Sequence, residues 1–173
     1  MRLQGKTVGY FLAQEVEDLE FWVPLMRLRE EGAKVIVIGL SNQKVRGHHG
    51  LEMTPDVSIE EAPKADVFDA LVIPGGWAPD RLRRNQGVLQ LVRDVHARGK
   101  IIASICHGGW VPISAGIVRG RRATGTSAIK DDLTNAGAIW VDESAFRDGN
   151  IVWGRVVEDI PNFCRELVAA LAE

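Results

Sequence analysis

The stretch that most constrains the fold is residues 101–110, where apolar residues lead directly into a cysteine, a histidine and two glycines. The apolar run has the composition of a buried strand. Small residues occur two positions before and two positions after Cys106, namely Ser104 and Gly108. This order predicts a nucleophile elbow, a sharp strand-to-helix turn that holds a reactive side chain at the carboxyl edge of a parallel sheet. We therefore expect an α/β fold.

The remaining chain alternates strand-like and helix-like patterns. Strands separated by helices predict a mostly parallel central sheet with helices on both faces, and the length suits one domain over residues 1–173. Three loops, 13–18, 75–80 and 106–110, should then meet at the carboxyl ends of the strands. We expect strands at 7–12, 34–39, 70–73 and 100–105, helices at 21–31, 87–98, 109–115, 129–136 and 158–171, a hairpin at 45–54, a loop at 55–69, and a late antiparallel hairpin built from 139–141, 145–147 and 151–153.

Composition excludes several classes of protein. A net charge of −2 gives no signature for nucleic-acid binding. Two cysteines in 173 residues do not suggest a disulfide scaffold. The first residues lack the apolar core of a signal peptide, and no apolar run approaches the length that spans a membrane. We expect a cytoplasmic protein that binds neither nucleic acid nor membrane.

Cys106 admits two interpretations. A free cysteine is often a small buried hydrophobic residue. A cysteine at an elbow is instead reachable at the sheet edge, and the positive end of the following helix favours its thiolate. The strand before Cys106 and the glycines after it favour the second interpretation, so we predict that Cys106 is a nucleophile. Cys164 falls in the C-terminal helix pattern and is predicted to be structural.

An acid beside the thiol is expected from the loop after the first strand. Residues 14–20 are rich in Glu and Asp. Acids at the start of a helix also complement its dipole, so their presence alone singles out none of them. A protonated carboxyl group in the site would donate a hydrogen bond to the sulfur, and burial would raise its pKa into the required range. Spacing leaves Glu15 and Glu17 as the candidates.

Two other loops carry candidate groups. Gly75 and Gly76 form either a plain turn or a backbone segment that approaches substrate and donates N–H groups to developing negative charge. Asp80 fits a helix cap, a surface acid or a partner for His107. His107 either brings its ring to Cys106 or supplies only its backbone N–H to an oxyanion.

No metal or cofactor is predicted. His48 and His49 are adjacent, but no cysteine or carboxylate at ligand spacing accompanies them, and a polar hairpin explains them. The chain has neither a phosphate-binding loop nor a dinucleotide-binding glycine pattern after its first strand.

Taken together, the motifs resemble the PfpI/ThiJ family, the intracellular-protease-like branch of the class I glutamine amidotransferase-like superfamily. Each piece is short, but the pieces occur in the family's order over nearly the whole chain, and their combination is specific. The matching pieces are EVEDLE (15–20), VIPGGWAPD (72–80), ASICHG (103–108), ISAG (113–116) and IKDDLTNAG (129–137).

The resemblance implies a flavodoxin-like three-layer sandwich with Cys106 as nucleophile. It also implies that Glu17 is the acid hydrogen-bonded to the cysteine, and that Gly76 and the His107 backbone bind the oxyanion. Family members form dimers or hexamers, so we expect a homo-oligomer. In the hexamers an acid from a neighbouring subunit pairs with the histidine after the cysteine. That acid is typically Glu, whereas this chain has Asp80.

The chain departs from the family after Cys-His-Gly. Pro is common there, but this sequence has Gly109 followed by Trp110. Trp110 either lines the mouth of the site as a substrate-binding residue or packs in the core.

The leading hypothesis is a stress-response enzyme of the glyoxalase III/deglycase type, which acts on small reactive carbonyls without a cofactor. Cys106 would add to the carbonyl, and an acid, with or without His107, would move protons. The second hypothesis is an intracellular cysteine peptidase assembled as an oligomer, with Asp80 contributed by another subunit. The third is a redox-sensing or chaperone-like stress protein whose thiol is oxidised.

Overall fold

A computed structural model describes residues 1–173. Its centre is a seven-stranded sheet with the strand order β10-β11-β7-β6-β1-β2-β5. Every neighbouring pair is parallel except β10 and β11, which form an antiparallel hairpin. The strands are β1 (Thr7–Leu12), β2 (Lys34–Gly39), β5 (Val57–Ser58), β6 (Ala70–Ile73), β7 (Ile101–Ile105), β10 (Ala145–Asp148) and β11 (Ile151–Gly154).

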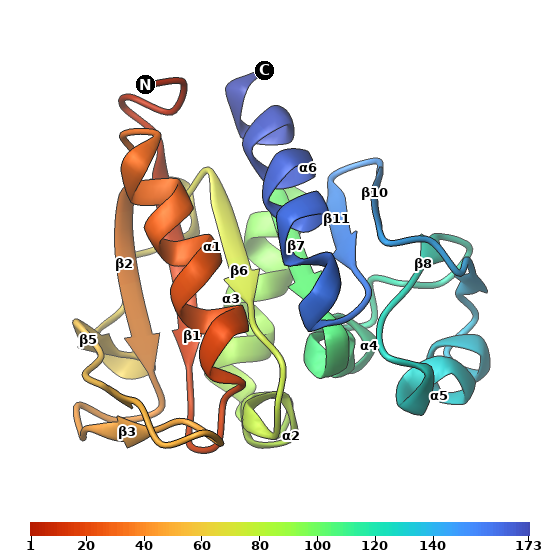
Figure 1. Ribbon diagram of the computed structural model, residues 1–173, viewed down its shortest axis with the longest axis horizontal. Helices are drawn as coiled ribbons and strands as arrows, with labels where there is room; N and C mark the ends of the chain where they lie inside the picture. The colour runs from red at the N-terminus through yellow and green to blue at the C-terminus, as the bar shows by residue number, and fades with distance from the viewer.

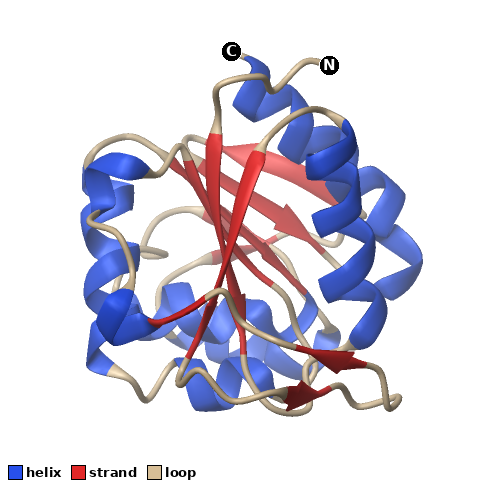
Figure 2. Cartoon of the chain, turned by 90° about the vertical axis from the view of Figure 1, so that its left-hand side faces the viewer, coloured by secondary structure: helices blue, strands red, loops and turns tan.

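Helices cover both faces of this sheet (Figures 1 and 2). One layer contains α1 (Asp18–Glu30) and α6 (Ile160–Ala172), and the other contains α3 (Gln86–Ala97), with α4 (Trp110–Ala115) packed on α3 and α2 (Ala78–Leu82) packed on α4. The predicted three-layer sandwich is therefore confirmed. None of the helices combines the length and the apolar composition that crossing a membrane would require.

The central strands read as continuous apolar runs because both of their faces are covered. Every residue of β6 and β7 is buried, as expected for strands between two helical layers. One hydrophobic cluster of 42 buried residues fills both interfaces of the sheet. This packing fixes the carboxyl ends of β1, β6 and β7 beside one another, at the lower edge of the sheet in Figure 1.

Helix α1 begins earlier than predicted. Its first residue is Asp18, because the Glu17 side chain caps the helix by accepting a hydrogen bond from the Glu20 N–H at 2.8 Å. Pro24 consequently lies inside the helix rather than in its first turn. The other long helices agree with the predicted ranges to within two residues.

The late hairpin differs from the prediction. Its 145–148 and 151–154 arms pair as expected, but the segment at 139–141 does not join them. Its residues form β9 (Ile139–Trp140), which pairs in parallel with β8 (Arg122–Ala123). The β8–β9 pair, with α5 (Lys130–Asn135), covers a second cluster of eight buried residues beside the main core. Strands of two residues carry too little alternation to be recognised in a sequence.

Two further segments complete the fold. The predicted hairpin insert is present as β3 (Val45–Arg46) paired with β4 (Glu52–Met53). The region predicted as a long loop contains the edge strand β5, which pairs with β2. Short 3-10 turns occur at η1 (Ile59–Glu61), η2 (Ala65–Val67), η3 (Cys106–Gly109), η4 (Ser127–Ile129) and η5 (Val157–Asp159).

Candidate active site

Cys106 lies at the turn between β7 and α4. Its φ angle is +59°, and only one other non-glycine residue, Glu15, has a positive φ. A left-handed conformation is strained for a side chain with a Cβ, and such strain is typical of functional turns. Gly108 is required here, because a Cβ at this residue would lie 2.6 Å from the Ile73 carbonyl oxygen. The strand, the strained cysteine and the small residues after it form the predicted elbow.

The three predicted loops meet at this elbow. The loop after β1 forms an isolated antiparallel bridge between Val16 and Gly76. In addition, the Glu17 N–H donates to the Gly75 carbonyl at 3.2 Å. A Cβ on Gly75 would lie 3.0 Å from the Cβ of Cys106. Gly75 is therefore the point at which the β1 and β6 loops contact the cysteine.

The acid beside the thiol is Glu20. Its side chain is fully buried, and its Oε1 accepts a hydrogen bond from the Gly75 N–H at 2.9 Å. Its Oε2 is buried and makes no hydrogen bond. The neighbouring Cys106 thiol, whose pKa responds to hydrogen bonding with Glu20, is the partner available to it.

The assignment of Glu17 as the acid bonded to the cysteine is therefore corrected. The Glu17 carboxylate caps α1 and lies 3.5 Å from the His49 ring nitrogen. Glu15, the other candidate, is half exposed, and its carboxylate lies 3.6 Å from Arg81. Both side chains belong to the rim around the cysteine.

Burial controls the protonation of the Cys106–Glu20 pair. Burial, with the nearby negative charge of Glu17, raises the pKa of Glu20 to about 8. Glu20 is therefore mostly protonated at neutral pH, although a backbone N–H bonds to it. Burial and the negative charge that Glu20 carries when ionised raise the pKa of Cys106 far above its ordinary value. The two groups interact, so their protons leave as a coupled pair.

The helix end was expected to favour the thiolate of Cys106, but burial acts in the opposite direction and raises the pKa of the thiol. A hydrogen bond from the His107 backbone N–H lowers the pKa of Cys106, but burial has the larger effect. Glu20 and His107 are the titratable side chains beside the thiol.

His107 brings its ring to the sulfur. Its Nδ1 lies 3.5 Å from the Cys106 Sγ, although adjacent side chains usually point apart. Burial lowers the pKa of His107, so the ring is neutral at pH 7 and one of its nitrogens can accept a proton. Of the two functions considered for His107, the structure places the ring beside the sulfur.

Gly76 adopts a φ of +69°, which glycine accepts without strain. Its neighbours use their N–H groups within the loop: Gly75 donates to Glu20, and Trp77 donates to the Glu15 carbonyl at 3.0 Å. Among the backbone hydrogen bonds outside the helices and strands, the Gly76 N–H donates none. The role of Gly76 and the His107 N–H as an oxyanion site stays a prediction.

Asp80 lies on α2 and is half exposed. Its carboxylate lies 3.1 Å from Arg84 on the same side of the helix. Whether Asp80 pairs with a histidine of another subunit stays a prediction, as does the homo-oligomer.

Trp110 is the first residue of α4 and is partly buried. Its indole N–H donates to Asp132 of α5 at 2.9 Å, and its ring also packs against the second hydrophobic cluster. Both interpretations of Trp110 therefore have support, because the ring also contacts His107 with 5.1 Å between centroids. Trp77, which the sequence reasoning did not consider, lies 5.5 Å from the same histidine ring.

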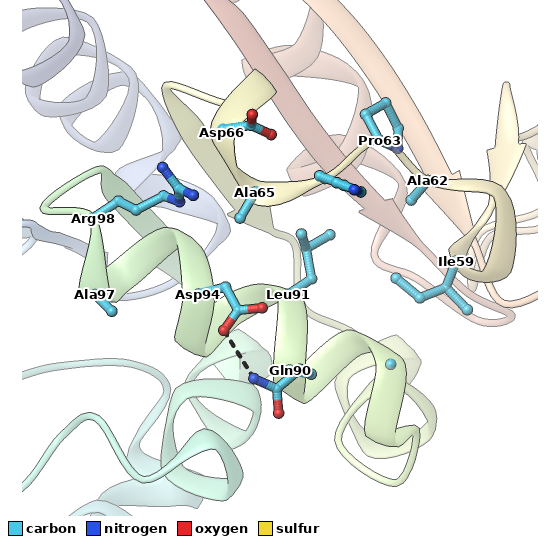
Figure 3. A pocket seen from close by; sticks show the side chains of 12 residues that line it. Ile59, Ala62, Pro63, Ala65, Asp66, Gln90, Leu91, Asp94, Ala97 and Arg98 are labelled. Atoms are coloured by element: carbon cyan, nitrogen blue, oxygen red, sulfur yellow. Dashed lines mark hydrogen bonds between the residues drawn. The ribbon is translucent and has the colours of Figure 1, made fainter.

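The largest cavity lies away from these residues. It has a volume of about 860 Å³ and runs between α3 and the segment 59–66, with charged and apolar groups on its walls. Figure 3 shows Arg98, Asp94 and Asp66 around it, with Gln90 hydrogen-bonded to Asp94 at 2.8 Å. It shares no residue with the cysteine site, which is formed by loops at the sheet edge.

A signal for Glu20 was present in the sequence. Glu20, Pro24 and Leu28 are four residues apart and lie on the buried stripe of α1. An acid on an apolar stripe is a stronger candidate for a buried carboxyl group than one that precedes the helix. Trp77 carried no comparable signal, because its neighbours come from other elements.

Comparisons with known proteins agree with this geometry. A model of the DJ-1/PfpI family matches residues 6–170. A deglycase of Pyrococcus abyssi is 44% identical over 92% of this chain and 95% of its own length. The deglycase PfpI of Pyrococcus furiosus is 40% identical over 94% of this chain and 97% of its own.

Solved structures show the same similarity. DJ-1beta of Drosophila melanogaster has a TM-score of 0.90 and 29% identity, covering 96% of this chain and 90% of that one. A protein of Anabaena variabilis with a DJ-1/ThiJ/PfpI-like and a ferritin-like domain has a TM-score of 0.93 and 40% identity over 96% of this chain. The present chain spans about half of that two-domain protein, 48% of its length.

Proposed function

Because this chain belongs to the DJ-1/PfpI family, we propose that it is a cysteine-dependent deglycase or cofactor-free glyoxalase that acts on small reactive carbonyls in a stress response. The observation that carries the proposal is the group of side chains at the elbow: the Cys106 sulfur lies beside the Glu20 carboxyl and 3.5 Å from the His107 ring. The deglycase names of the Pyrococcus relatives support the same class of substrate.

The first step is addition of the thiol to an aldehyde carbonyl. The Cys106 sulfur forms a bond to the carbonyl carbon, and the π electrons of the C=O bond move to the oxygen. The thiol proton passes to the neutral His107 ring, or to Glu20 in the fraction of molecules in which Glu20 is ionised, and a proton returns to the oxygen, which gives a neutral hemithioacetal. A pKa of about 8 suits Glu20 to this transfer, because a group that titrates near neutral pH both accepts and donates protons readily.

The second step converts methylglyoxal into lactate. The carbon bonded to sulfur loses its proton while the oxygen of the adjacent carbonyl gains one, which gives an enediol. The adjacent carbon is then protonated as the hydroxyl on the carbon bonded to sulfur loses its proton and becomes C=O, and a lactoyl thioester results. Water then hydrolyses the thioester, so that methylglyoxal and one water give lactate and free Cys106. In a glycated amine of the hemiaminal type, the C–N bond breaks and the nitrogen takes a proton, so that the neutral amine leaves. The Cys106 sulfur, having given up its proton, bonds to the same carbon and forms the same hemithioacetal. The N–H groups of Gly76 and His107 would stabilise the oxyanion in each step.

The test measures lactate formation from methylglyoxal, and amine release from a methylglyoxal-treated amino acid, with the buffer-catalysed rate subtracted. We expect Cys106→Ala to abolish both and Glu20→Gln to reduce both by about 100-fold, which is typical for loss of a general acid–base group. Cys164→Ala is the matched control, because Cys164 is the other free cysteine and is buried in α6. Equal rates for wild type and Cys106→Ala would overturn the proposal.

A further inference from the structure

Three aromatic rings gather beside the reactive sulfur. The centroid of the His107 ring lies 5.5 Å from that of Trp77 and 5.1 Å from that of Trp110. The two indole rings are 6.3 Å apart, with an angle of 31° between their planes. Trp77, His107 and Trp110, called the aromatic cluster below, come from the β6–α2 loop, the elbow and the start of α4.

Trp110 is held in place on two sides. Its indole N–H donates to Asp132, and the Arg83 guanidinium lies 5.5 Å over its ring. Arg83 is itself fixed by a hydrogen bond of 2.8 Å to the Ser114 hydroxyl. A ring with both contacts is pre-organised, so binding against it costs little side-chain entropy.

Trp77 is the exposed member of the cluster. Its side chain is 48% exposed, which is unusual for a residue whose burial is so favourable. Its backbone is fixed, because Trp77 N–H donates to the Glu15 carbonyl and the residue follows the bridge between Val16 and Gly76. The half-exposed indole of Trp77, whose backbone is fixed, therefore borders the site.

The cluster lies where a substituent on the substrate would be. His107 contributes a ring to the cluster, and its Nδ1 is 3.5 Å from the Cys106 sulfur. A carbonyl carbon bonded to this sulfur therefore carries its other substituent within reach of the rings. Arg83 already lies over Trp110, so a cationic substituent would be repelled there, whereas a neutral planar group would contact the rings without that repulsion.

We propose that the aromatic cluster is a binding surface for a neutral aryl group, and that the site therefore favours α-oxoaldehydes with an aryl substituent over those with a methyl group. This inference rests on the proposed function for its substrate class. Offset and edge-to-face contacts with aromatic rings predict a preference of about threefold to tenfold once intrinsic reactivity is removed.

The first measurement compares initial kcat/KM values for phenylglyoxal and methylglyoxal, each divided by its rate of reaction with a free thiol. Initial rates are used so that turnover is measured before phenylglyoxal modifies arginine side chains. We expect Trp77→Leu to lower the aryl-to-methyl ratio by about threefold to tenfold, and Trp77→Phe to restore most of it. Trp140→Leu is the matched control, because Trp140 is a partly buried tryptophan of β9 outside the cluster.

The second measurement does not require turnover. Alkylation of Cys106 by phenacyl bromide and by bromoacetone is followed by peptide mass, with both rates divided by those of free cysteine. Wild type should show the aryl preference and Trp77→Leu should lose it. Aryl-selective alkylation without turnover of either aldehyde would overturn the proposed function and support the aryl surface. The same normalised alkylation ratio in wild type and Trp77→Leu would overturn the aryl surface, whether or not the aldehydes are turned over.

Discussion

The Tyr10 hydroxyl donates a hydrogen bond of 2.8 Å to the backbone carbonyl of Glu20. This carbonyl would normally accept from the residue four positions later, but that residue is Pro24, which has no N–H. Tyr10 thus supplies from β1 the donor that the helix lacks. Both residues are fully buried, so the bond ties the first turns of α1, and with them the Glu20 carboxyl, to the central sheet.

The pairing of Tyr10 with Pro24 predicts a rescue. Tyr10→Phe leaves the Glu20 carbonyl buried without a donor, and we expect it to lower the free energy of unfolding by about 1–3 kcal/mol. Adding Pro24→Ala restores a backbone N–H at the right position of the helix, so the double variant should lose less than Tyr10→Phe alone. Urea denaturation of the four proteins in this cycle measures the coupling. Additive losses would show that the hydroxyl acts elsewhere.

Glu20→Gln should affect ionisation and turnover in opposite directions. The negative charge of Glu20 raises the pKa of Cys106, so its removal should shift the alkylation rate of Cys106 to lower pH. The same change removes the group that returns the proton, so carbonyl turnover should fall. Glu17→Gln should shift the alkylation profile in the same direction but less, because the charge of Glu17 raises the pKa of Cys106 less than that of Glu20 does.

The control for this comparison is Glu15→Gln, an exposed acid on the same loop whose carboxylate faces Arg81 instead of the thiol. Its alkylation profile should match that of wild type. A Glu20→Gln profile that stays in place, or moves to higher pH, would contradict the proposed coupling of the two groups.

The raised pKa of Glu20 also makes stability depend on pH. In the unfolded chain this carboxyl has its ordinary pKa of 4.5, and in the folded protein burial raises that pKa to about 8. Between these values the folded state holds a proton that the unfolded state has lost, so the free energy of unfolding falls as pH rises from about 5 to 8. At about 1.4 kcal/mol per pKa unit, the contribution of Glu20 is a few kcal/mol.

Urea denaturation of wild type and Glu20→Gln between pH 5 and 8 measures this contribution. The glutamine variant should show a flatter dependence on pH, and its stability relative to wild type should increase steadily across the range. Parallel curves for the two proteins would mean that Glu20 is ionised in the folded state at neutral pH.

Gly75 should tolerate no side chain. A Cβ at this residue would contact the Glu20 carboxyl and lie 3.1 Å from the His107 nitrogen as well as close to Cys106. We expect Gly75→Ala to lower the free energy of unfolding by about 1–3 kcal/mol and to reduce turnover, because three groups of the site must move apart. Gly87→Ala in α3 is the control: its closest contacts are 3.2 Å, to two side chains, and alanine favours a helix. Equal losses in both variants would argue against crowding at Gly75.

Most of the sheet could be predicted because its central strands are runs of mainly apolar residues, four to six residues long. β1, β2, β6 and β7 have this pattern, and their order along the chain implies the parallel arrangement. β5, β8 and β9 could not be found in this way, because each has only two residues and depends on pairing with a distant segment.

The same distinction between local patterns and contacts with distant segments applies to the site. The elbow at Cys106 and the glycines at 75 and 76 are local patterns, and the structure brings them together as expected. The sequence left Glu15 and Glu17 as candidate acids and did not bring in Glu20, because the predicted start of α1 at residue 21 places Glu20 before the helix. The observed start makes Glu17 the cap and Glu20 a buried residue of the first turn. The aromatic cluster depends on three separate elements, so no single stretch of sequence contains it.

The strain at the elbow gives a last prediction. Cys106 holds a φ of +59°, which costs a residue with a Cβ about 1 kcal/mol or more and costs glycine nothing. Cys106→Gly should therefore be more stable than Cys106→Ala by about 1 kcal/mol, even after the greater flexibility of glycine in the unfolded chain is counted. Ser104 is the matched control, because it lies in the extended strand β7, where glycine should be the less stable of the two replacements. The comparison uses urea denaturation of the four variants. If glycine is less stable than alanine by the same amount at residues 104 and 106, the elbow relaxes when the sulfur is removed. The cysteine side chain itself would then hold the turn in its strained conformation.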